Sequence, residues 1–316
     1  MALFITEREV AELLDFDSAI AAVEEGFKLM AEGKAVNIPR RRAVVPGAVL
    51  HVLQGAVLGE YGVMGLKAYV STRGGARFAV LLFSTSGELL ALIEADRLGQ
   101  IRTGAASAVA TRHMARRGAE VLGVIGSGRQ AKAQFEALSR VMSLRLVKVF
   151  SRSREHARSF AEFVESRGLD AVVADSYEEA AKADVVVTAT NSQTPFLRAS
   201  YLPKGVHINA IGSNWANRAE LYPDAVHAAD VIAVDDPAQA REEAGDLIQA
   251  GALDRAVPLA EIVAGRIRGR PSEEAITIFK SLGIAVEDLV AAKVVYDRAV
   301  KRGLGRELAF SGVWPK

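Results

Sequence analysis

Three small residues near the middle of the chain have the spacing of a dinucleotide-binding loop. The segment VLGVIGSGRQAKAQFEAL places Gly126, Gly128 and Ala131 between an apolar run and a helix-like segment. In such a loop the first glycine allows a tight turn, the second lets the backbone approach a pyrophosphate, and the small third residue lets helix pack on strand. An ordinary glycine-rich turn is the alternative, but the strand–loop–helix context favours a dinucleotide site.

The residues after the next apolar run indicate which dinucleotide is bound. LVKVF is followed by Ser151, Arg152 and Ser153, and the first carboxylate comes only at Glu155. An acidic residue here would bind the ribose 2′-hydroxyl of NAD, whereas two hydroxyls and a guanidinium suit a 2′-phosphate. The alternative is a solvated helix N-terminus, where basic residues oppose the helix dipole. The sequence therefore predicts NADP(H) in preference to NAD(H).

Three cationic residues in the first third of the chain could bind a carboxylate. Lys67 lies inside the apolar run VMGLKAYVS, Arg102 lies in the small-residue segment IRTGAASAVA, and Arg41 belongs to an RRR run. Buried lysines and arginines are rare unless they are paired, and two guanidiniums with an ammonium would make a carboxylate clamp. The alternative is that the three are unrelated, with Lys67 at a sheet edge and Arg41 solvated.

Several other chemistries are excluded or disfavoured. The chain has no cysteine, which excludes thiol nucleophiles and cysteine-ligated metals. The five histidines show no metal-ligand spacing, so no metal site is predicted. Asp235 and Asp236 follow an apolar run, but with Pro237 they are better explained as the start of a helix capped by Asp236.

The overall composition is that of an ordinary globular protein. The 316 residues are half apolar and about a quarter charged, with a formal net charge of +1, which gives no electrostatic reason to expect a nucleic acid partner. Charged residues appear early in MALFITEREV, and no window has the uninterrupted apolar length of a membrane span. We therefore expect a cytoplasmic protein with no membrane partner.

The elements that must position these residues form two groups with different patterns of helices and strands. A capping box at Thr6 and Glu9 predicts a helix over 6–14, a second helix follows from 17 to 33, and short β-like runs over 36–94 suggest an antiparallel α+β unit. After a small-residue helix at 96–117, apolar strands alternate with helices at 130–141, 154–167 and 177–182, which favours a doubly wound parallel sheet. A long helix over 286–302 could belong to either unit.

Eight segments resemble, in order and spacing, those of the ornithine cyclodeaminase/mu-crystallin family. They are Arg41, GLKAYV, IRTGAASAVA, VIGSGRQA, TATNSQTP, HINAIGSNWANRAEL, VDDPAQAREEAGDL and IFKSLGIAVEDL. The resemblance implies an α/β fold with a Rossmann domain at 113–293 and an α+β substrate-binding and dimerisation domain at 1–112, joined by the C-terminal segment 294–316. It also implies a homodimer acting on a small α-imino or amino acid.

The resemblance assigns roles to individual residues. Arg41, Lys67 and Arg102 match the family's substrate-carboxylate and catalytic groups, and Trp215 is expected to line the substrate pocket. Lys67 either donates a proton or holds the carboxylate. The residues expected at the cofactor are Thr103, Gly126, Ser127, Gly128, Arg129, Gln130, Ser151, Arg152, Ser153, Thr190, Asn191, Ser192 and Ser213.

One position departs from the family's pattern. In cyclodeaminases and alanine dehydrogenase, the loop in INAIGSNWANRAEL carries a catalytic aspartate at the position of Asn214. An amide cannot act as a base, whereas reduction of a ready-made imine needs only a carboxylate clamp, a hydride and orienting hydrogen bonds. We therefore expect an NAD(P)H-dependent reductase of α-imino acids, with Asn214 and Trp215 beside the nicotinamide. The alternatives are an ornithine cyclodeaminase and a non-catalytic NADPH- and ligand-binding protein, and Trp215 could instead simply pack under the loop.

Overall fold

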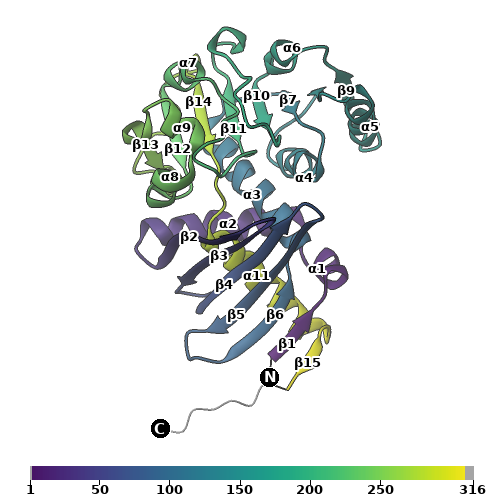
Figure 1. The fold of residues 1–316 in the computed structure, drawn as a ribbon, viewed down its shortest axis with the longest axis vertical. Helices are drawn as coiled ribbons and strands as arrows, with labels where there is room; N and C mark the ends of the chain where they lie inside the picture. Colours follow the sequence, from purple (N-terminus) through teal and green to yellow (C-terminus); the bar gives the residue numbers. More distant parts are fainter. Residues whose placement is uncertain (1, 310–316) are drawn as a thin grey trace. The chain divides into compact units, whose positions relative to one another are not determined.

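The computed structural model describes residues 2–309, which form parts of two compact units (Figure 1). Unit 1 comprises residues 1–102 and 284–316, and unit 2 comprises residues 103–283. Residues 310–316 of the expected C-terminal segment lie outside the described residues.

Both boundaries lie earlier in the chain than the expected 112/113 and 293/294. The first boundary falls inside helix α3 (Asp96–Met114), because the part of the helix that follows residue 102 packs within unit 2. The side chain of Gln134 donates to the Thr103 carbonyl oxygen, and a Cβ at Gly104 would lie only 2.7 Å from the Ala133 carbonyl oxygen. The second boundary precedes helix α11 (Ala285–Arg302), which packs on the sheet of unit 1.

Unit 2 is a doubly wound α/β domain, which confirms the predicted Rossmann sheet. Its strands pair in parallel in the order β13-β12-β14-β11-β10-β7-β8-β9. The strand order reverses between β7 and β10, which is where such sheets bind ligands. The strands are β7 (Val121–Ile125), β8 (Leu146–Phe150), β9 (Asp170–Val173), β10 (Val185–Thr188), β11 (His207–Ala210), β12 (Val231–Val234), β13 (Ala256–Pro258) and β14 (Thr277–Lys280).

Short helices and two 3₁₀ turns connect these strands. They are α4 (Arg129–Leu138), α5 (Arg154–Glu165), α6 (Tyr177–Ala181), η1 (Ala199–Tyr201), α7 (Pro223–His227), α8 (Pro237–Glu243), α9 (Gly245–Gln249), η2 (Leu253–Arg255) and α10 (Leu259–Val263). The side chain of Asp236 accepts from the Gln239 amide at the start of α8, and Pro237 is the first helical residue, as predicted.

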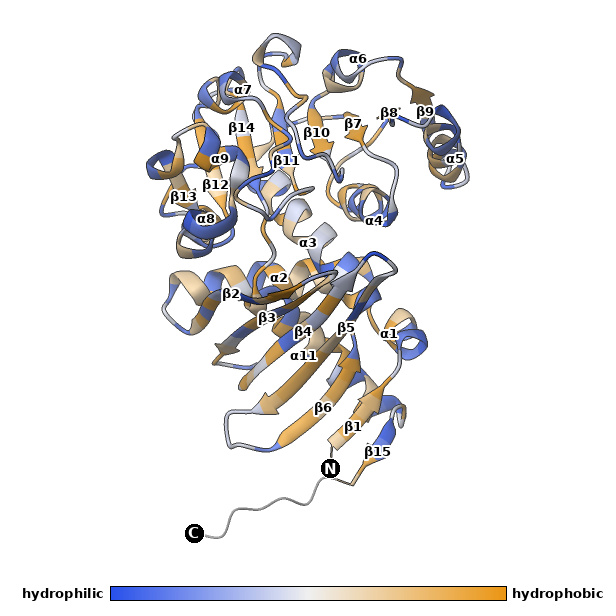
Figure 2. Ribbon diagram, in the orientation of Figure 1, coloured by the Kyte–Doolittle hydropathy of each residue, from blue (hydrophilic) through white to orange (hydrophobic). Residues whose placement is uncertain are grey.

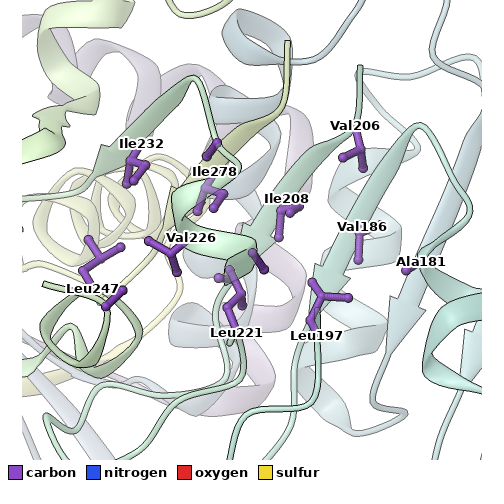
Figure 3. Close-up of a cluster of buried hydrophobic side chains, with 14 of the residues drawn as sticks. Ala181, Val186, Leu197, Val206, Ile208, Leu221, Val226, Ile232, Leu247 and Ile278 are labelled. Atoms are coloured by element: carbon purple, nitrogen blue, oxygen red, sulfur yellow. The ribbon is translucent and has the colours of Figure 1, made fainter. Parts of the chain in front are cut away.

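The parallel strands of unit 2 are apolar because both faces of the sheet are buried. On one face Val186, Ile208 and Ile278 pack against Leu221 and Leu247 (Figure 3). A second cluster, which includes Phe135 and Phe160, covers other strand residues. Strands buried on both sides read as continuous apolar runs, which is why the sequence revealed them.

Unit 1 is built on a mostly antiparallel sheet with the order β15-β1-β6-β5-β4-β3-β2. Its strands are β1 (Ala2–Ile5), β2 (Ala35–Val45), β3 (Ala48–Val57), β4 (Val63–Thr72), β5 (Gly75–Ser84), β6 (Leu89–Glu94) and β15 (Arg306–Leu308). Helices α1 (Glu7–Leu13) and α2 (Phe16–Ala31) follow β1, and α1 begins with the predicted capping box. Strands β15 and β1, at one edge of the sheet, were not predicted, because each is short and pairs with a distant part of the chain.

The two faces of the unit 1 sheet differ. Helix α11 packs against β3, β4 and β5 on one face and also contacts α2. The other face carries exposed apolar side chains on β2, β3 and β4, and the strands are coloured largely as hydrophobic in Figure 2. We call it the open face and define it by Val36, Ile38, Leu50, Met64 and Val70, which are each at least 36% exposed. Exposed apolar patches of this kind mark interaction surfaces.

Candidate active site

Unit 2 contains a cavity of about 850 Å³ where the strand order reverses. It lies at the carboxyl ends of β7, β8 and β10, the position at which doubly wound sheets bind nucleotides. The sequence-predicted residues that line it are Gly126, Ser127, Gly128, Arg129, Gln130, Ser151, Arg152, Ser153, Thr190, Asn191 and Ser192. Most of the residues predicted at the cofactor therefore line one cavity, although they come from three separate segments of the chain.

The two glycines of the loop have the geometry that a dinucleotide requires. Gly126 has a φ of 111°, and a Cβ there would clash with the Ala189 carbonyl oxygen. A Cβ on Gly128 would meet only open space, and no side chain caps helix α4, which begins at the next residue. The backbone is thus bare where a pyrophosphate would approach a helix N-terminus. The buried side-chain oxygen of Gln130 has no hydrogen-bond partner among residues 2–309, so it could accept a bond from a ligand.

The end of β8 offers groups for a phosphate. The Ser127 and Ser151 hydroxyls lie 3.1 Å apart, and the exposed Arg152 donates to the side-chain oxygen of Asn191 at 3.3 Å. Ser153 caps α5 by accepting from the His156 amide. Among the residues that line the cavity there is no carboxylate, so nothing in this wall repels a 2′-phosphate.

Several cavity residues were not singled out from the sequence. They are the aromatic residues Phe150, Tyr177 and Phe196, with His156 beside them. The Phe150 and Tyr177 rings lie 4.4 Å apart, and those of Tyr177 and Phe196 stack at 4.6 Å. Phe150 is the last residue of β8, whereas Tyr177 begins α6 and Phe196 lies in the loop after β10, so no common spacing could have revealed them.

Two predicted cofactor residues do not line this cavity. Thr103 is buried in α3, where its carbonyl oxygen accepts from Gln134. Ser213 is buried in the loop after β11, where its hydroxyl accepts from the Trp215 amide. Neither position excludes a contact with another part of a long ligand, so both assignments stay predictions.

Lys67 is buried in unit 1 and paired with a carboxylate. Its Nζ lies 2.7 Å and 2.6 Å from the two side-chain oxygens of Asp288, on helix α11. Arg102 contacts the same carboxylate through Nε at 2.8 Å and contacts Glu287 through a terminal nitrogen at 2.6 Å. The predicted convergence of Lys67 and Arg102 is therefore present, and the two cations meet at a carboxylate pair.

The environment of Lys67 favours loss of its proton. The pKa of Lys67 is lowered to about 7: burial lowers it most, the positive charge of Arg102 acts in the same direction, and Asp288 opposes both effects. A lysine that titrates near neutral pH can donate a proton and also exist in its neutral form at working pH. This group can therefore act as an acid in a way that an ordinary surface lysine cannot.

Arg41 does not face Lys67. Arg42 is opposite His51 and donates to its Nδ1 at 3.2 Å, so Arg42 and His51 share a face, and the adjacent Arg41 points to the other side. The register places Lys67 opposite Leu53, which is on the His51 side of the sheet, whereas Arg41 is exposed on the open face. The register thus places Lys67, which meets Arg102 at Asp288, on one side of the sheet and Arg41 on the other, and the role of Arg41 at the substrate stays a prediction.

Arg40 occupies the place that was expected of Arg41. It is buried, donates to the Tyr69 hydroxyl at 3.3 Å, and its positive charge lowers the pKa of Lys67. A β-bulge between Ile38 and Arg41 shifts the register of β2. This bulge decides which arginine of the run faces inwards, and spacing alone does not reveal it.

Glu287 and Asp288 were missed although the sequence contained a signal. Both are buried within α11, and they were quoted only as part of the segment IFKSLGIAVEDL. Two adjacent acids inside an apolar helix must be paired, because an isolated buried carboxylate is very costly. Their partners, Lys67 and Arg102, were themselves the unexplained buried cations.

Asn214 and Trp215 lie in the loop that follows β11 in unit 2. Both are partly buried, and the Arg218 guanidinium lies over the Trp215 ring at 5.7 Å. A Cβ on Gly245 would clash with the Arg218 carbonyl oxygen and lie 2.5 Å from that of Trp215, so the loop backbone rests on the start of α9. The proposed roles of Asn214 and Trp215 beside substrate stay predictions.

We expect Arg102→Lys to raise the Michaelis constant for the imino acid substrate about tenfold or more. The guanidinium bridges Glu287 and Asp288, and an ammonium cannot reproduce its planar fork. Steady-state kinetics at saturating NADPH would measure the change, with thermal unfolding as a check on folding. A variant with wild-type Michaelis constants would show that Arg102 has only a structural role.

Comparison with known proteins shows to which family the chain belongs. The model of the ornithine cyclodeaminase/mu-crystallin family matches residues 2–303. The chain belongs to this family. A Delta(1)-pyrroline-2-carboxylate reductase of Bacillus cereus is 42% identical over 71% of each chain. The family's fold is also that of the structure, so the resemblance noted in the sequence is confirmed.

Two solved structures of the family cover almost the whole chain. The Delta(1)-pyrroline-2-carboxylate reductase of Thermococcus litoralis, in complex with NADH and L-proline, is 29% identical with a TM-score of 0.92, covering 97% of this chain and 100% of its own. An archaeal alanine dehydrogenase dimer with bound NAD is 35% identical with a TM-score of 0.93, covering 98% and 99%. These two relatives, named as a pyrroline-2-carboxylate reductase and an alanine dehydrogenase, are both oxidoreductases at C=N or CH–NH bonds.

The described residues contain neither a metal-binding cluster nor a membrane-spanning helix. Within residues 2–309, no group of three or more His, Cys, Asp or Glu side chains could hold a metal ion. In the same part of the chain, no helix has the length and apolarity needed to cross a membrane. The expected cytoplasmic location stays a prediction.

Proposed function

We propose that this protein is an NADPH-dependent reductase of α-imino acids, which yields an L-amino acid and can run in reverse as an amino-acid dehydrogenase. The observation that carries the proposal is the buried Lys67, held by Asp288 beside Arg102. Its pKa is lowered to about 7, chiefly by burial, which suits a proton donor. Relatives named as pyrroline-2-carboxylate reductase and alanine dehydrogenase perform reactions of this class, which supports it. The proposal fits both units of the chain.

Reduction of an imine needs one hydride at carbon and one proton at nitrogen. A nicotinamide cofactor, when bound, supplies the hydride. In unit 1, Lys67 supplies the proton to the imine nitrogen, and its neutral form recovers a proton from solvent. Arg102 fixes Asp288, which in turn keeps the ammonium at a defined position. Orientation of the proton donor before the reaction is what this buried cluster contributes.

NADP(H) is the proposed cofactor, in preference to NAD(H). The cavity of unit 2 has the bare glycine loop for a pyrophosphate, and Ser151, Arg152 and Ser153 line it without a competing carboxylate. A guanidinium and hydroxyl groups bind a phosphate more strongly than a neutral ribose hydroxyl. The two structural relatives were solved with NADH and NAD, so the proposed preference rests on the residues at the β8 end of this chain alone.

The open face of unit 1 supports a homodimer. Its apolar residues Val36, Ile38, Leu50, Met64 and Val70 form a contiguous half-exposed sheet surface, and a related alanine dehydrogenase is a dimer. A second copy would remove this surface from water. Analytical ultracentrifugation tests the assignment, and a monomer at micromolar concentration would refute it.

Three activities are separated by one set of assays. NADPH oxidation with pyrroline-2-carboxylate, or with pyruvate and ammonia, is expected from the proposed reductase. Ammonia release from L-ornithine without net NADPH consumption would instead identify a cyclodeaminase. Tight NADPH binding with no turnover of any imino acid would identify a non-catalytic binding protein.

We expect Asn214→Asp to gain ornithine-dependent ammonia release or amino-acid dehydrogenase activity and to lose part of its imine reduction. A carboxylate can act as the base that an amide cannot, and general-base catalysis contributes about a hundredfold to ten-thousandfold. Coupled assays for ammonia and for NADPH measure both changes. Asn217→Asp, which changes an exposed asparagine in the same loop, is the matched control. Unchanged kinetics on every substrate would place the loop outside the site.

A further inference from the structure

Glu220 is a completely buried carboxylate that neither the sequence nor the proposed mechanism explains. It lies between the loop after β11 and helix α7. Its side-chain oxygens accept from the Thr188 hydroxyl at 2.7 Å, from the Thr190 hydroxyl at 2.7 Å and amide at 2.8 Å, and from the Gly212 amide at 2.9 Å. Four donors thus converge on one carboxylate.

The donors come from the end of β10 and from the loops that follow β10 and β11. Thr188 ends β10, and Thr190 lines the cofactor cavity, where its hydroxyl also accepts from the Ser192 amide at 3.1 Å. Gly212 begins the loop that carries Asn214 and Trp215. The carboxylate of Glu220 therefore joins the cavity wall to the loop that the proposed function places beside the substrate.

Two further charged residues, Asp246 and Lys280, hold the backbone at Glu220. The Asp246 side chain accepts from the backbone amides of Glu220 at 2.6 Å and Leu221 at 2.9 Å, and Lys280 lies 2.7 Å from the other side-chain oxygen of Asp246. All three ionisable side chains are at most 1% exposed. Burying charges is costly, and apolar residues could fill this space more cheaply. What the carboxylate adds is therefore the placement of its four donors.

The backbone around Glu220 leaves little freedom. A Cβ on Gly212 would clash with the Glu220 carboxylate and lie 2.5 Å from the Thr190 carbonyl oxygen. The two loops are thus in close contact as well as hydrogen-bonded. A change in the Glu220 side chain must move at least one of them.

We propose that Glu220 is a positioning residue, whose buried carboxylate holds the loops after β10 and β11 in one arrangement and thereby sets the nicotinamide end of the cofactor site. The proposal rests on the proposed function, because it assigns the β11 loop to the nicotinamide end. Among residues 2–309, Glu220 forms no hydrogen bond with Ser151 or Arg152; the β8 end of the cavity is linked to the β10 loop by one exposed hydrogen bond, from Arg152 to Asn191, and serves as the internal reference.

The test uses Glu220→Gln and two ligands that probe different parts of the cavity. Glutamine keeps the size of the side chain but presents an amide group to donors that need an acceptor. We expect the dissociation constant of NADPH to rise about tenfold, a loss of about 1.4 kcal/mol. That of adenosine 2′,5′-bisphosphate, which lacks the nicotinamide half, should stay within about twofold. Titration calorimetry measures both constants without any turnover.

A fluorescence readout reports the loop directly. The chain has two tryptophans, so a Trp314→Phe background leaves Trp215 as the single reporter. In that background Glu220→Gln should shift the Trp215 emission to longer wavelength, because the loop loses its anchor and the ring gains water. Glu274→Gln is the matched control, since it makes the same chemical change at an exposed residue that pairs with Lys204.

A second variant keeps the proposal testable if Glu220→Gln does not fold. Thr188→Val keeps the shape of a buried side chain and removes one donor. It should again raise the dissociation constant of NADPH but not that of adenosine 2′,5′-bisphosphate, by a smaller factor than Glu220→Gln. Equal weakening of both ligands, or no weakening of either, would overturn the inference. A wild-type protein that binds NADPH but reduces no imino acid would overturn the proposed function alone.

Discussion

Lys67→Met is expected to lower kcat/KM for imine reduction by about a hundredfold to ten-thousandfold, the usual contribution of a positioned proton donor. The methionine fills a similar volume but cannot protonate the imine nitrogen. Lys28→Met is the matched control, because Lys28 lies on the surface of the same unit and pairs with Glu25 at 3.6 Å. Steady-state NADPH oxidation measures the loss, and thermal unfolding checks that the variant is folded.

The pH profile of the wild-type protein tests the same role. Because the pKa of Lys67 is lowered to about 7, the ammonium form dominates below pH 7 and is lost as the pH rises. The value of kcat/KM should therefore fall on the alkaline side of pH 7. Asp288→Asn removes the negative charge that favours the ammonium, so the same limb should move to lower pH. A flat profile between pH 6 and 9, or wild-type rates from Lys67→Met, would remove Lys67 from the chemistry.

Arg152→Asp is expected to reverse the cofactor preference, with a change of about a hundredfold in the ratio of kcat/KM for NADPH to that for NADH. The substitution removes a guanidinium that would bind the 2′-phosphate, and it adds a carboxylate that repels the phosphate and accepts from the ribose 2′-hydroxyl of NADH. Two such changes of about 1.4 kcal/mol each give this ratio. Initial rates with the two cofactors at a fixed imino acid concentration measure it.

Arg154→Asp is the control for this experiment. Arg154 lies two residues further along, undergoes the same change of charge, and pairs with Asp175 at 2.5 Å on the surface outside the cavity. It should leave the ratio unchanged. If Arg152→Asp also leaves the ratio unchanged, the phosphate site has been assigned to the wrong residue.

Local patterns in the sequence were sufficient to predict the architecture of unit 2. Apolar runs of four or five residues marked its buried strands, and Gly126 with Gly128 marked the turn between β7 and α4. These signals work because each depends on residues that are neighbours in the chain. Most of the cofactor cavity could be predicted for the same reason, since its lining residues follow directly on strand ends.

The cationic cluster of unit 1 could be predicted only in part. Lys67 and Arg102 were recognisable as unusual cations in apolar segments, but Asp288 lies 221 residues from Lys67 in the sequence. No local pattern links residues so far apart. Local patterns also could not show which arginine of the run faces inwards, because a bulge of one residue in β2 exchanges the faces of Arg40 and Arg41. Glu220 was overlooked because a buried acceptor and its donors have no fixed spacing.

The division of the chain has a consequence for the order in which the protein folds during synthesis. Unit 2 is one continuous segment, residues 103–283, so all of it emerges from the ribosome before any of α11. Unit 1 must wait, because its sheet lacks the covering helix until residues 285–302 have been made. Domains generally fold as units once they are complete. The nascent chain would therefore carry a folded nucleotide domain while Lys67 still lacks Asp288, and the last stretch of translation would complete the substrate half.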